Sequence, residues 1–258
     1  MRDRDFTKEF YYFLNKVKNK ENFTYLRFSD GEMFILQNKD IILSSTQVKI
    51  GNEQNSKGPG HPIYDKKTFD PVTHSDFRDK LIESFLYKEK NYYVGISCKC
   101  CVGQEYWDWQ LENLEKDSDH LTWSNAFVNS NYPLFMKEFY PEIIKRGATI
   151  ICNEHADLSE FNWVNKDFRI KDDSFTDLSP ILDIKNYIKE NKIENELFLF
   201  SAASLSNVAQ YELYKEFPNN TYLDIGTTLS YEWKIPAKRG YLNEFYSGGN
   251  NYNKCIWN

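Results

Sequence analysis

The sequence lacks the features that mark membrane proteins and nucleic-acid-binding proteins. No apolar run approaches the roughly 20 residues that a membrane-spanning helix needs, and the N-terminal segment MRDRDFTKEFYYFLNKVK has no signal-peptide core or cleavage site. Acidic residues outnumber basic ones, 38 to 32, for a net charge of −6, so no polybasic face for nucleic acid is expected. We therefore expect a cytoplasmic protein with no transmembrane segment and no nucleic-acid partner. A small phosphorylated ligand fits this charge, because it needs only a local positive site.

Cysteine is too scarce and too irregularly spaced for a disulfide framework. The five cysteines are Cys98, Cys100, Cys101, Cys152 and Cys255, and an odd number without framework spacing is typical of a reducing compartment. No second cysteine pair or histidine at finger-like spacing follows Cys98-Lys-Cys100-Cys101. We interpret this run as buried or half-buried thiols at a strand end rather than as a zinc site.

The chain length and the apolar pattern predict the fold class. The 258 residues suit a single domain covering residues 1–258. Short, continuously apolar runs alternate with segments of helical spacing, which predicts strands buried on both faces. We expect an α/β fold, with a Rossmann-like, mostly parallel sheet and helices on both faces. The expected strands are 23–28, 92–97, 148–152, 197–201 and 221–225, and the expected helices include 6–17, 77–85, 134–145, 181–188 and 205–217.

Two features of the composition remain open to interpretation. Aromatic residues make up 17% of the chain, either because of an AT-rich genome or because they stack on rings in a carbohydrate or nucleobase cleft. The stretch Ile50–Thr73 is rich in Gly, Pro, Asn and Lys. It is longer than an ordinary connection in a compact domain, so we expect it to be functional or mobile.

Ligands bind at the carboxyl ends of the strands in a sheet of this kind. That rule selects a rim of polar or small segments in which to look for the site. The rim segments are 29–32, 97–101, 153–155, 201–207 and 224–228.

Two carboxylates flank a glycine at the end of the first expected strand. Asp30 and Glu32 stand on either side of Gly31, which allows a tight turn that a side chain would obstruct. Two hard oxygen ligands suit Mg²⁺ or Mn²⁺, which also bind substrate phosphates, and Arg27 could add a positive charge for a phosphate. In the structural alternative, Asp30 caps the following helix and Glu32 lies in its first turn. Spacing alone leaves both interpretations open.

A turn of small residues, 201–207, separates an expected strand from an expected helix. Ser201 and Ser204 would let a phosphate approach the backbone, and the helix N-terminus offers unpaired N–H groups. The glycines of the dinucleotide-binding fingerprint are absent. A tight turn with a helix cap is the alternative.

Three more rim side chains are candidates for a general base: Glu154, His155 and Asp224. Asp224 could equally hold a sugar hydroxyl. The structural alternatives are a turn at Asp224 followed by packed Tyr231 and Trp233, and a structural or solvent-facing role for His155.

With these residues in view, both ends of the chain resemble a known family. The stretch 25–33 (YLRFSDGEM) resembles the N-terminal signature of the GT-D-type bacterial glycosyltransferases, a family first described as a domain of unknown function. The stretches 201–207 (SAASLSN), 223–226 (LDIG) and 231–233 (YEW) resemble its distal part. The resemblance implies a Rossmann-like GT-D fold and transfer of a hexose from a UDP-sugar donor to a glycan acceptor, in polysaccharide or glycoprotein glycan biosynthesis.

The resemblance also implies that Asp30 and Glu32 serve the metal, Mn²⁺ or Mg²⁺, and the nucleotide diphosphate. We expect catalytic roles for Asp30, Glu32, Glu154, His155 and Asp224, and donor binding by Arg27, Ser29, Gly31, Ser201, Ser204 and Asn207. The distal turn departs from the family's glycine-rich pattern, because Ala203, Ser204 and Ser206 stand at those places. The stretch Ile50–Thr73 also matches poorly, and we treat it as a candidate lid on the acceptor side.

Two other functions fit the same residues. A metal-dependent phosphoesterase acting on nucleotide or sugar phosphates would use the same carboxylates. A non-catalytic sugar-binding module would explain the aromatic residues without a metal. The sequence does not choose between inversion and retention at the sugar, and it leaves the oligomeric state open, a homo-oligomer included.

Overall fold

A seven-stranded sheet forms the centre of the structure, a computed structural model that describes residues 5–55, 66–113 and 119–256. The strand order is β7-β6-β1-β11-β10-β8-β9, and every neighbouring pair is parallel. The strands are β1 (Thr24–Arg27), β6 (Tyr92–Ile96), β7 (Leu121–Trp123), β8 (Ala148–Asn153), β9 (Val164–Ile170), β10 (Leu197–Ser201) and β11 (Thr221–Asp224). The predicted α/β class is confirmed.

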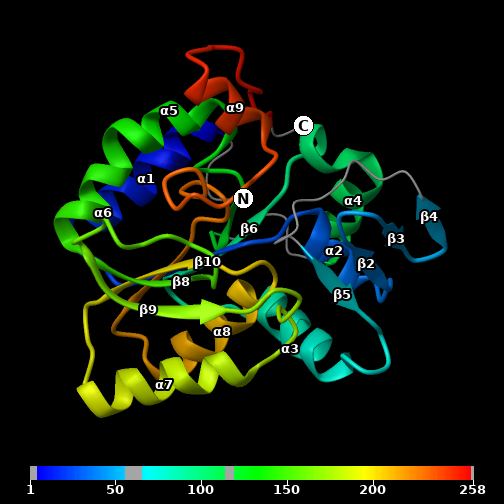
Figure 1. Cartoon of the computed structure of the whole chain (residues 1–258), viewed down its shortest axis with the longest axis horizontal. Helices are drawn as coiled ribbons and strands as arrows, with labels where there is room; N and C mark the ends of the chain where they lie inside the picture. Colours follow the sequence, from blue (N-terminus) through cyan, green and yellow to red (C-terminus); the bar gives the residue numbers. More distant parts are fainter. Residues whose placement is uncertain (1–4, 56–65, 114–118, 257–258) are drawn as a thin grey trace.

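Helices cover both faces of this sheet, as the sequence predicted. One face carries α1 (Phe6–Lys18), α5 (Tyr132–Leu134) and α6 (Tyr140–Arg146), and the other carries α3 (Ser75–Leu86), α7 (Ser179–Asn191) and α8 (Leu205–Glu216) (Figure 1). The remaining α-helices of the described residues are α2 (Asp30–Leu36), α4 (Lys99–Asn113) and α9 (Gly240–Tyr246), and a 3₁₀ helix (Asn129–Asn131) and a π-helix (Phe135–Phe139) flank α5. Within the described residues, none of the helices has both the length and the apolar character that crossing a membrane requires.

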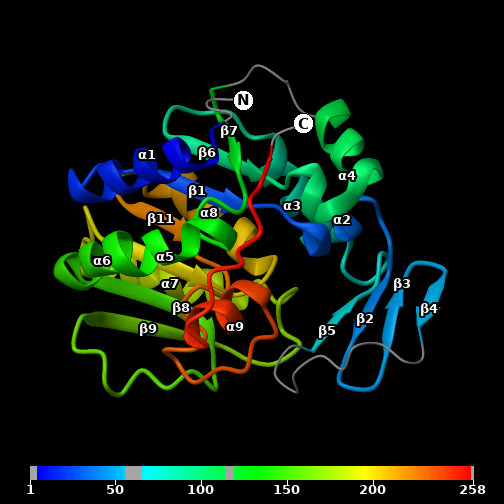
Figure 2. The same ribbon diagram turned by 90° about the horizontal axis from the view of Figure 1, so that it is seen from above.

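A second, smaller sheet corrects the interpretation of Ile50–Thr73 as one irregular stretch. Four short strands pair antiparallel in the order β4-β3-β2-β5, outside the main sheet and beside α2 (Figure 2). They are β2 (Ile41–Leu43), β3 (Val48–Ile50), β4 (Glu53–Asn55) and β5 (Lys67–Phe69). Each has only three residues, too few to establish a strand period in the sequence. Residues 56–65 of the stretch lie outside the described residues, and its role as a lid stays a prediction.

The aromatic side chains mainly build the core. Phe13 of α1 contacts Phe23, Tyr25, Tyr93 and Phe127 at ring-centroid distances of 4.7 to 6.1 Å. Such tilted and edge-to-face contacts are favourable beyond the area they bury. Many of the aromatic side chains in the described residues are buried in this way, including Phe28, Tyr92 and Tyr222.

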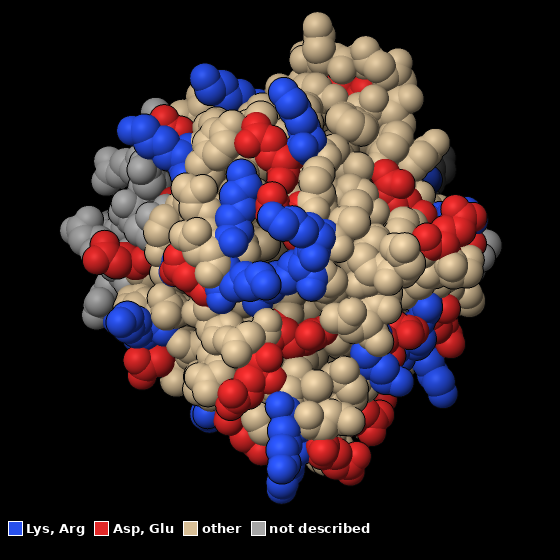
Figure 3. All heavy atoms as spheres, turned by 90° about the vertical axis from the view of Figure 1, so that its left-hand side faces the viewer, with Lys and Arg blue, Asp and Glu red and all other residues tan. Residues whose placement is uncertain are grey.

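The surface carries charges of both signs. On the face drawn in Figure 3, a central group of basic side chains is bordered by acidic ones. That face therefore has no continuous basic surface of the kind that a polyanion would need.

Candidate functional site

Three neighbouring strands end at one edge of the main sheet. β11 lies between β1 and β10, and all three run parallel. Asp224 at the end of β11 pairs with Phe200 of β10. The sheet thus brings Arg27, Asp224 and Ser201 to a single rim, where ligands of such sheets bind.

Glu32 is buried and joins two turns of this rim. Its Oε2 accepts hydrogen bonds from the Ser29 backbone N–H at 2.9 Å and from Ser29 Oγ at 2.8 Å. Its Oε1 accepts a hydrogen bond from Ser204 Oγ at 2.8 Å. The bond from the Ser29 N–H is the glutamate half of a capping box at the start of α2. The bond from Ser204 ties the β1–α2 turn to the β10–α8 turn, so Glu32 and Ser204 hold the rim in shape.

Asp30 is the exposed carboxylate of the pair. It is the first residue of α2, and its Oδ1 accepts a hydrogen bond from the Gly31 N–H at 3.0 Å. The expectation that Gly31 permits a tight turn is wrong, because its φ is not positive and a Cβ there would meet nothing within 4 Å. A side chain at position 31 would therefore point into open space.

Arg27 and Asp224 form a buried ion pair beneath this rim. Arg27 Nη1 lies 3.9 Å from Asp224 Oδ1, and their side chains are 18% and 8% exposed. Arg27 Nε donates to the Ser124 carbonyl, and Asp224 Oδ1 accepts from the Gly226 N–H at 2.7 Å. Burial raises the pKa of Asp224 to about 7, although the Arg27 guanidinium and the Gly226 N–H favour its carboxylate form. Asp224 therefore ionises less readily than an exposed aspartate does, and it positions Arg27.

Gly226 makes room for the Arg27 guanidinium. Its φ is +51°, and a Cβ at this position would lie 1.7 Å from Arg27 Nη1. We expect Gly226→Ala to lower the free energy of unfolding by more than the roughly 1–2 kcal/mol that a left-handed alanine costs by itself. Chemical denaturation measures this loss. Gly248→Ala is the matched control, because Gly248 has φ +76° with nothing within 4 Å of its Cβ position. Equal losses in the two variants would contradict a role for Gly226 in seating Arg27.

The turn between β10 and α8 is held by its own side chains. Asn207 is buried, and its Nδ2 donates to the Arg27 carbonyl at 2.9 Å. Ser204 is buried, and its hydroxyl donates a hydrogen bond to Glu32. Ser201 is half-buried at the end of β10. Ala203 has φ +49°, a left-handed conformation that favours glycine. Asn207 and Ser204 thus support the site from beneath, and direct donor binding by them stays a prediction.

Glu154 and His155 lie at another part of the rim. They follow β8, which β10 separates from β11. His155 Nε2 lies 3.2 Å from Asp172 Oδ2, and Glu154 Oε1 accepts from the Asp172 N–H at 3.4 Å. A carboxylate beside a histidine fixes the orientation of its ring. Asp172 was missed because it follows β9, a mostly polar strand that gives no continuous apolar run.

Two serines of the rim were also missed as supports. Ser97 Oγ lies 2.8 Å from Ser124 Oγ and donates to the Phe28 carbonyl at 3.1 Å. Since the Ser124 carbonyl accepts from Arg27, these serines link the ends of β6 and β7 to β1. No local pattern in the sequence reveals such contacts.

A hollow of about 380 Å³ lies beside the segment that follows β11. Tyr231, Ile235 and Leu242 are among its lining residues, together with Tyr246 of α9. Tyr231 is 58% exposed and stacks on Tyr246 at a centroid distance of 3.6 Å. This aromatic wall is a surface on which a sugar ring could stack.

Known proteins resemble this chain in fold rather than in sequence. No family model and no curated protein sequence matches it. Solved structures do match, and they show its fold: the chain has a glycosyltransferase fold of the GT-D type. One is a structure of the domain of unknown function 1792, described as a distinct glycosyltransferase fold, with 13% identity, TM-score 0.54 and coverage of 93% of this chain and 81% of that one. Another is a glycosyltransferase of the same domain from Streptococcus sanguinis, with 17% identity, TM-score 0.53 and coverage of 96% and 85%.

Proposed function

We propose that this protein is a metal-assisted glycosyltransferase that moves a hexose from a UDP-sugar to a glycan acceptor. The observation that carries the proposal is the position of Asp30 in a chain with a glycosyltransferase fold. Its exposed carboxylate begins α2 at the carboxyl edge of the sheet, beside the Glu32–Ser204 link. The Arg27–Asp224 pair lies at the same edge.

Asp30 fits a divalent cation better than Glu32 does. Mg²⁺ usually takes one or two carboxylates and completes its shell with waters and substrate phosphates. Both oxygens of Glu32 accept hydrogen bonds from serines, whereas Asp30 is exposed. We therefore assign Mn²⁺ or Mg²⁺ to Asp30 and a positioning role to Glu32. Such a cation supplies positive charge that stabilises the departing nucleoside diphosphate.

Other residues of the rim suit the same leaving group. The Arg27 side chain is 18% exposed, and its guanidinium would add positive charge for a phosphate at this edge. α8 begins directly after the β10 turn, so the positive end of its dipole faces this edge. Arg27 and the start of α8 would thus stabilise negative charge as it develops on the diphosphate.

The acceptor hydroxyl needs a base only if the sugar configuration inverts. His155 is the best candidate, because it is exposed and paired with Asp172 at 3.2 Å. Asp224 is buried against Arg27 and fits a supporting role instead. If the reaction retains the sugar configuration, no general base is needed and His155 has no such role.

The fold favours a transferase over the two other functions. A phosphoesterase would use Asp30 in a similar way, and a sugar-binding module could use the hollow beside Tyr231. Neither accounts for a glycosyltransferase fold that extends over more than nine-tenths of the chain. The three functions differ in their ligands and products, which makes them separable by experiment.

A thermal-shift screen with UDP and UDP-hexoses tests the proposal. With Mn²⁺ present, a nucleotide at about 100 times its dissociation constant stabilises the fold by about 2.7 kcal/mol, so we expect a Tm rise of several degrees. Without Mn²⁺ the rise should shrink, because the diphosphate loses its cation. Stabilisation by free sugars but not by UDP would favour the binding module. Rapid release of sugar or phosphate in the absence of any acceptor would favour the phosphoesterase.

A further inference from the structure

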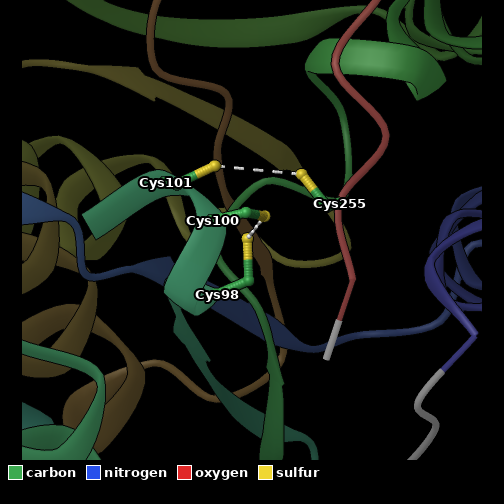
Figure 4. Close-up of side chains that lie close together, drawn as sticks. All are labelled: Cys98, Cys100, Cys101 and Cys255. Carbon is green, nitrogen blue, oxygen red and sulfur yellow. Dashed lines mark hydrogen bonds between the residues drawn. The ribbon is translucent and has the colours of Figure 1, made fainter. Parts of the chain in front are cut away.

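Four cysteines from two distant parts of the chain converge on one point. Cys98, Cys100 and Cys101 lie where β6 leads into α4, and Cys255 lies in the C-terminal segment (Figure 4). Their four sulfur atoms all lie within 4.8 Å of one another. The Sγ atoms of Cys98 and Cys100 are 2.9 Å apart, and those of Cys101 and Cys255 are 3.9 Å apart. Cys98 and Cys255 are buried, so the cluster is closed on one side.

The sulfur spacing fits a tetrahedral metal ion. Zinc–sulfur bonds of about 2.3 Å hold the sulfurs of a tetrahedron roughly 3.8 Å apart. The Sγ–Sγ separations of 2.9 and 3.9 Å lie on either side of that value. Shifts of about an ångström would therefore give the four sulfurs tetrahedral spacing around one ion. A set of four thiolates in this geometry is diagnostic of zinc or an iron–sulfur centre. A structural zinc site is normally complete with four protein ligands, as this one would be.

Two asparagine side chains point their N–H groups at the sulfurs. Asn125 Nδ2 lies 3.2 Å from Cys101 Sγ and 3.1 Å from Cys255 Sγ. Asn129 Nδ2 lies 3.2 Å from Cys255 Sγ. Hydrogen-bond donors around sulfur stabilise thiolates, the form that binds metals, and such outer contacts tune a metal site. The surroundings therefore suit four thiolates around a cation.

We propose that Cys98, Cys100, Cys101 and Cys255 bind one Zn²⁺ as a structural site. Each thiol releases its proton as a zinc–sulfur bond forms, and the step needs no oxidant or reductant. The ion fastens the C-terminal segment to the start of α4. This proposal replaces the interpretation of Cys98-Lys-Cys100-Cys101 as thiols without a metal, which was reached because the fourth ligand, Cys255, lies 154 residues after Cys101.

The zinc site braces the rim that carries the candidate active site. Cys98 follows Ser97, which donates to the Phe28 carbonyl. Asn125 follows Ser124, whose carbonyl accepts from Arg27. A cation that holds Cys98 and Asn125 in place would therefore also stabilise the loops around Arg27. This role is separate from sugar transfer and does not depend on it.

Metal analysis of the reduced, purified protein tests the proposal. We expect about one zinc ion per chain by elemental mass spectrometry, and intense visible absorption of tetrahedral thiolate-bound cobalt after replacement by Co²⁺. Cys255→Ser and Cys101→Ser should lose both signals. Cys152→Ala is the matched control and should keep them, because Cys152 is buried in β8. A chelator should lower the Tm of the wild type but not that of Cys255→Ser.

Three outcomes would overturn the site. The first is a reduced wild type that takes up neither Zn²⁺ nor Co²⁺. The second is equal zinc content in Cys255→Ser and the wild type, which would mean adventitious metal. The third is a Cys101–Cys255 disulfide in the native protein with no zinc uptake after reduction. Each readout is metal content or stability, so a failure here leaves the proposed sugar transfer untouched.

Discussion

Asp30→Asn is expected to lower kcat for sugar transfer by roughly 100- to 1000-fold, the loss typical of removing one group that stabilises developing charge. Asparagine keeps the size of the side chain and an oxygen that can accept from the Gly31 N–H. It removes the negative charge that would hold Mn²⁺ or Mg²⁺. Because Asp30 is exposed, the free energy of unfolding should change by no more than about 1 kcal/mol through the helix dipole.

The assay is sugar transfer from UDP-hexoses at saturating and at limiting Mn²⁺, with Tm recorded for each variant. Asp183→Asn on α7 is the matched control, since it also removes one exposed carboxylate. It should behave as the wild type does. Turnover of Asp30→Asn within a few-fold of the wild type would exclude Asp30 from the metal site. A large fall in its Tm would instead indicate a structural role.

The sequence predicted five strands of the main sheet, β1, β6, β8, β10 and β11, but missed β9 and the three-residue strand β7. β6, β10 and β11 are buried at almost every position, so their apolar runs are continuous. β9 escaped prediction because it lies at the edge of the sheet and exposes several polar side chains. The small antiparallel sheet escaped because its strands are too short for a period to appear.

The candidate site could be predicted only where contacts are local. Glu32 in the first turn of α2 follows from spacing, whereas the expected cap is wrong by one residue, because Ser29 is the N-cap and Asp30 is the first residue of the helix. The contact between Glu32 and Ser204 joins residues 172 positions apart, and no pattern in one sequence encodes it. Asp224 was identified as a rim carboxylate, but its burial against Arg27 depends on β11 lying next to β1.

Arg27→Met should produce the largest loss of stability, and the loss should depend on pH. Removing one partner of a buried ion pair costs roughly 3–5 kcal/mol, because the other charge is left without compensation. That cost requires Asp224 to be ionised. The raised pKa of Asp224, about 7 in the folded protein against an ordinary value of 3.8, sets the pH window.

The sign follows from linkage. A carboxyl group whose folded pKa is raised contributes stability at low pH that is lost as the pH rises through that pKa. Without Arg27, the pKa of Asp224 should rise further, since the guanidinium favours the carboxylate. At pH 5.5 Asp224 is mostly protonated in both folded proteins, so the variant loses only the other contacts of Arg27. At pH 8.5 the Asp224 carboxylate of the wild type is compensated by Arg27. In the variant, Asp224 must either take up a proton or remain charged in the interior without a cationic partner.

Urea denaturation of Arg27→Met at pH 5.5 and pH 8.5 measures this difference. We expect a clearly greater loss at pH 8.5, with each unit of added pKa shift contributing about 1.4 kcal/mol. In the double variant with Asp224→Asn the pH dependence should disappear, because no titrating carboxyl remains at this position. Arg239→Met, at an exposed arginine, should show little loss at either pH. An equal loss for Arg27→Met at both pH values would mean that the pair is not the electrostatic unit its geometry indicates, and Arg27 would then stabilise the rim through its bond to the Ser124 carbonyl alone.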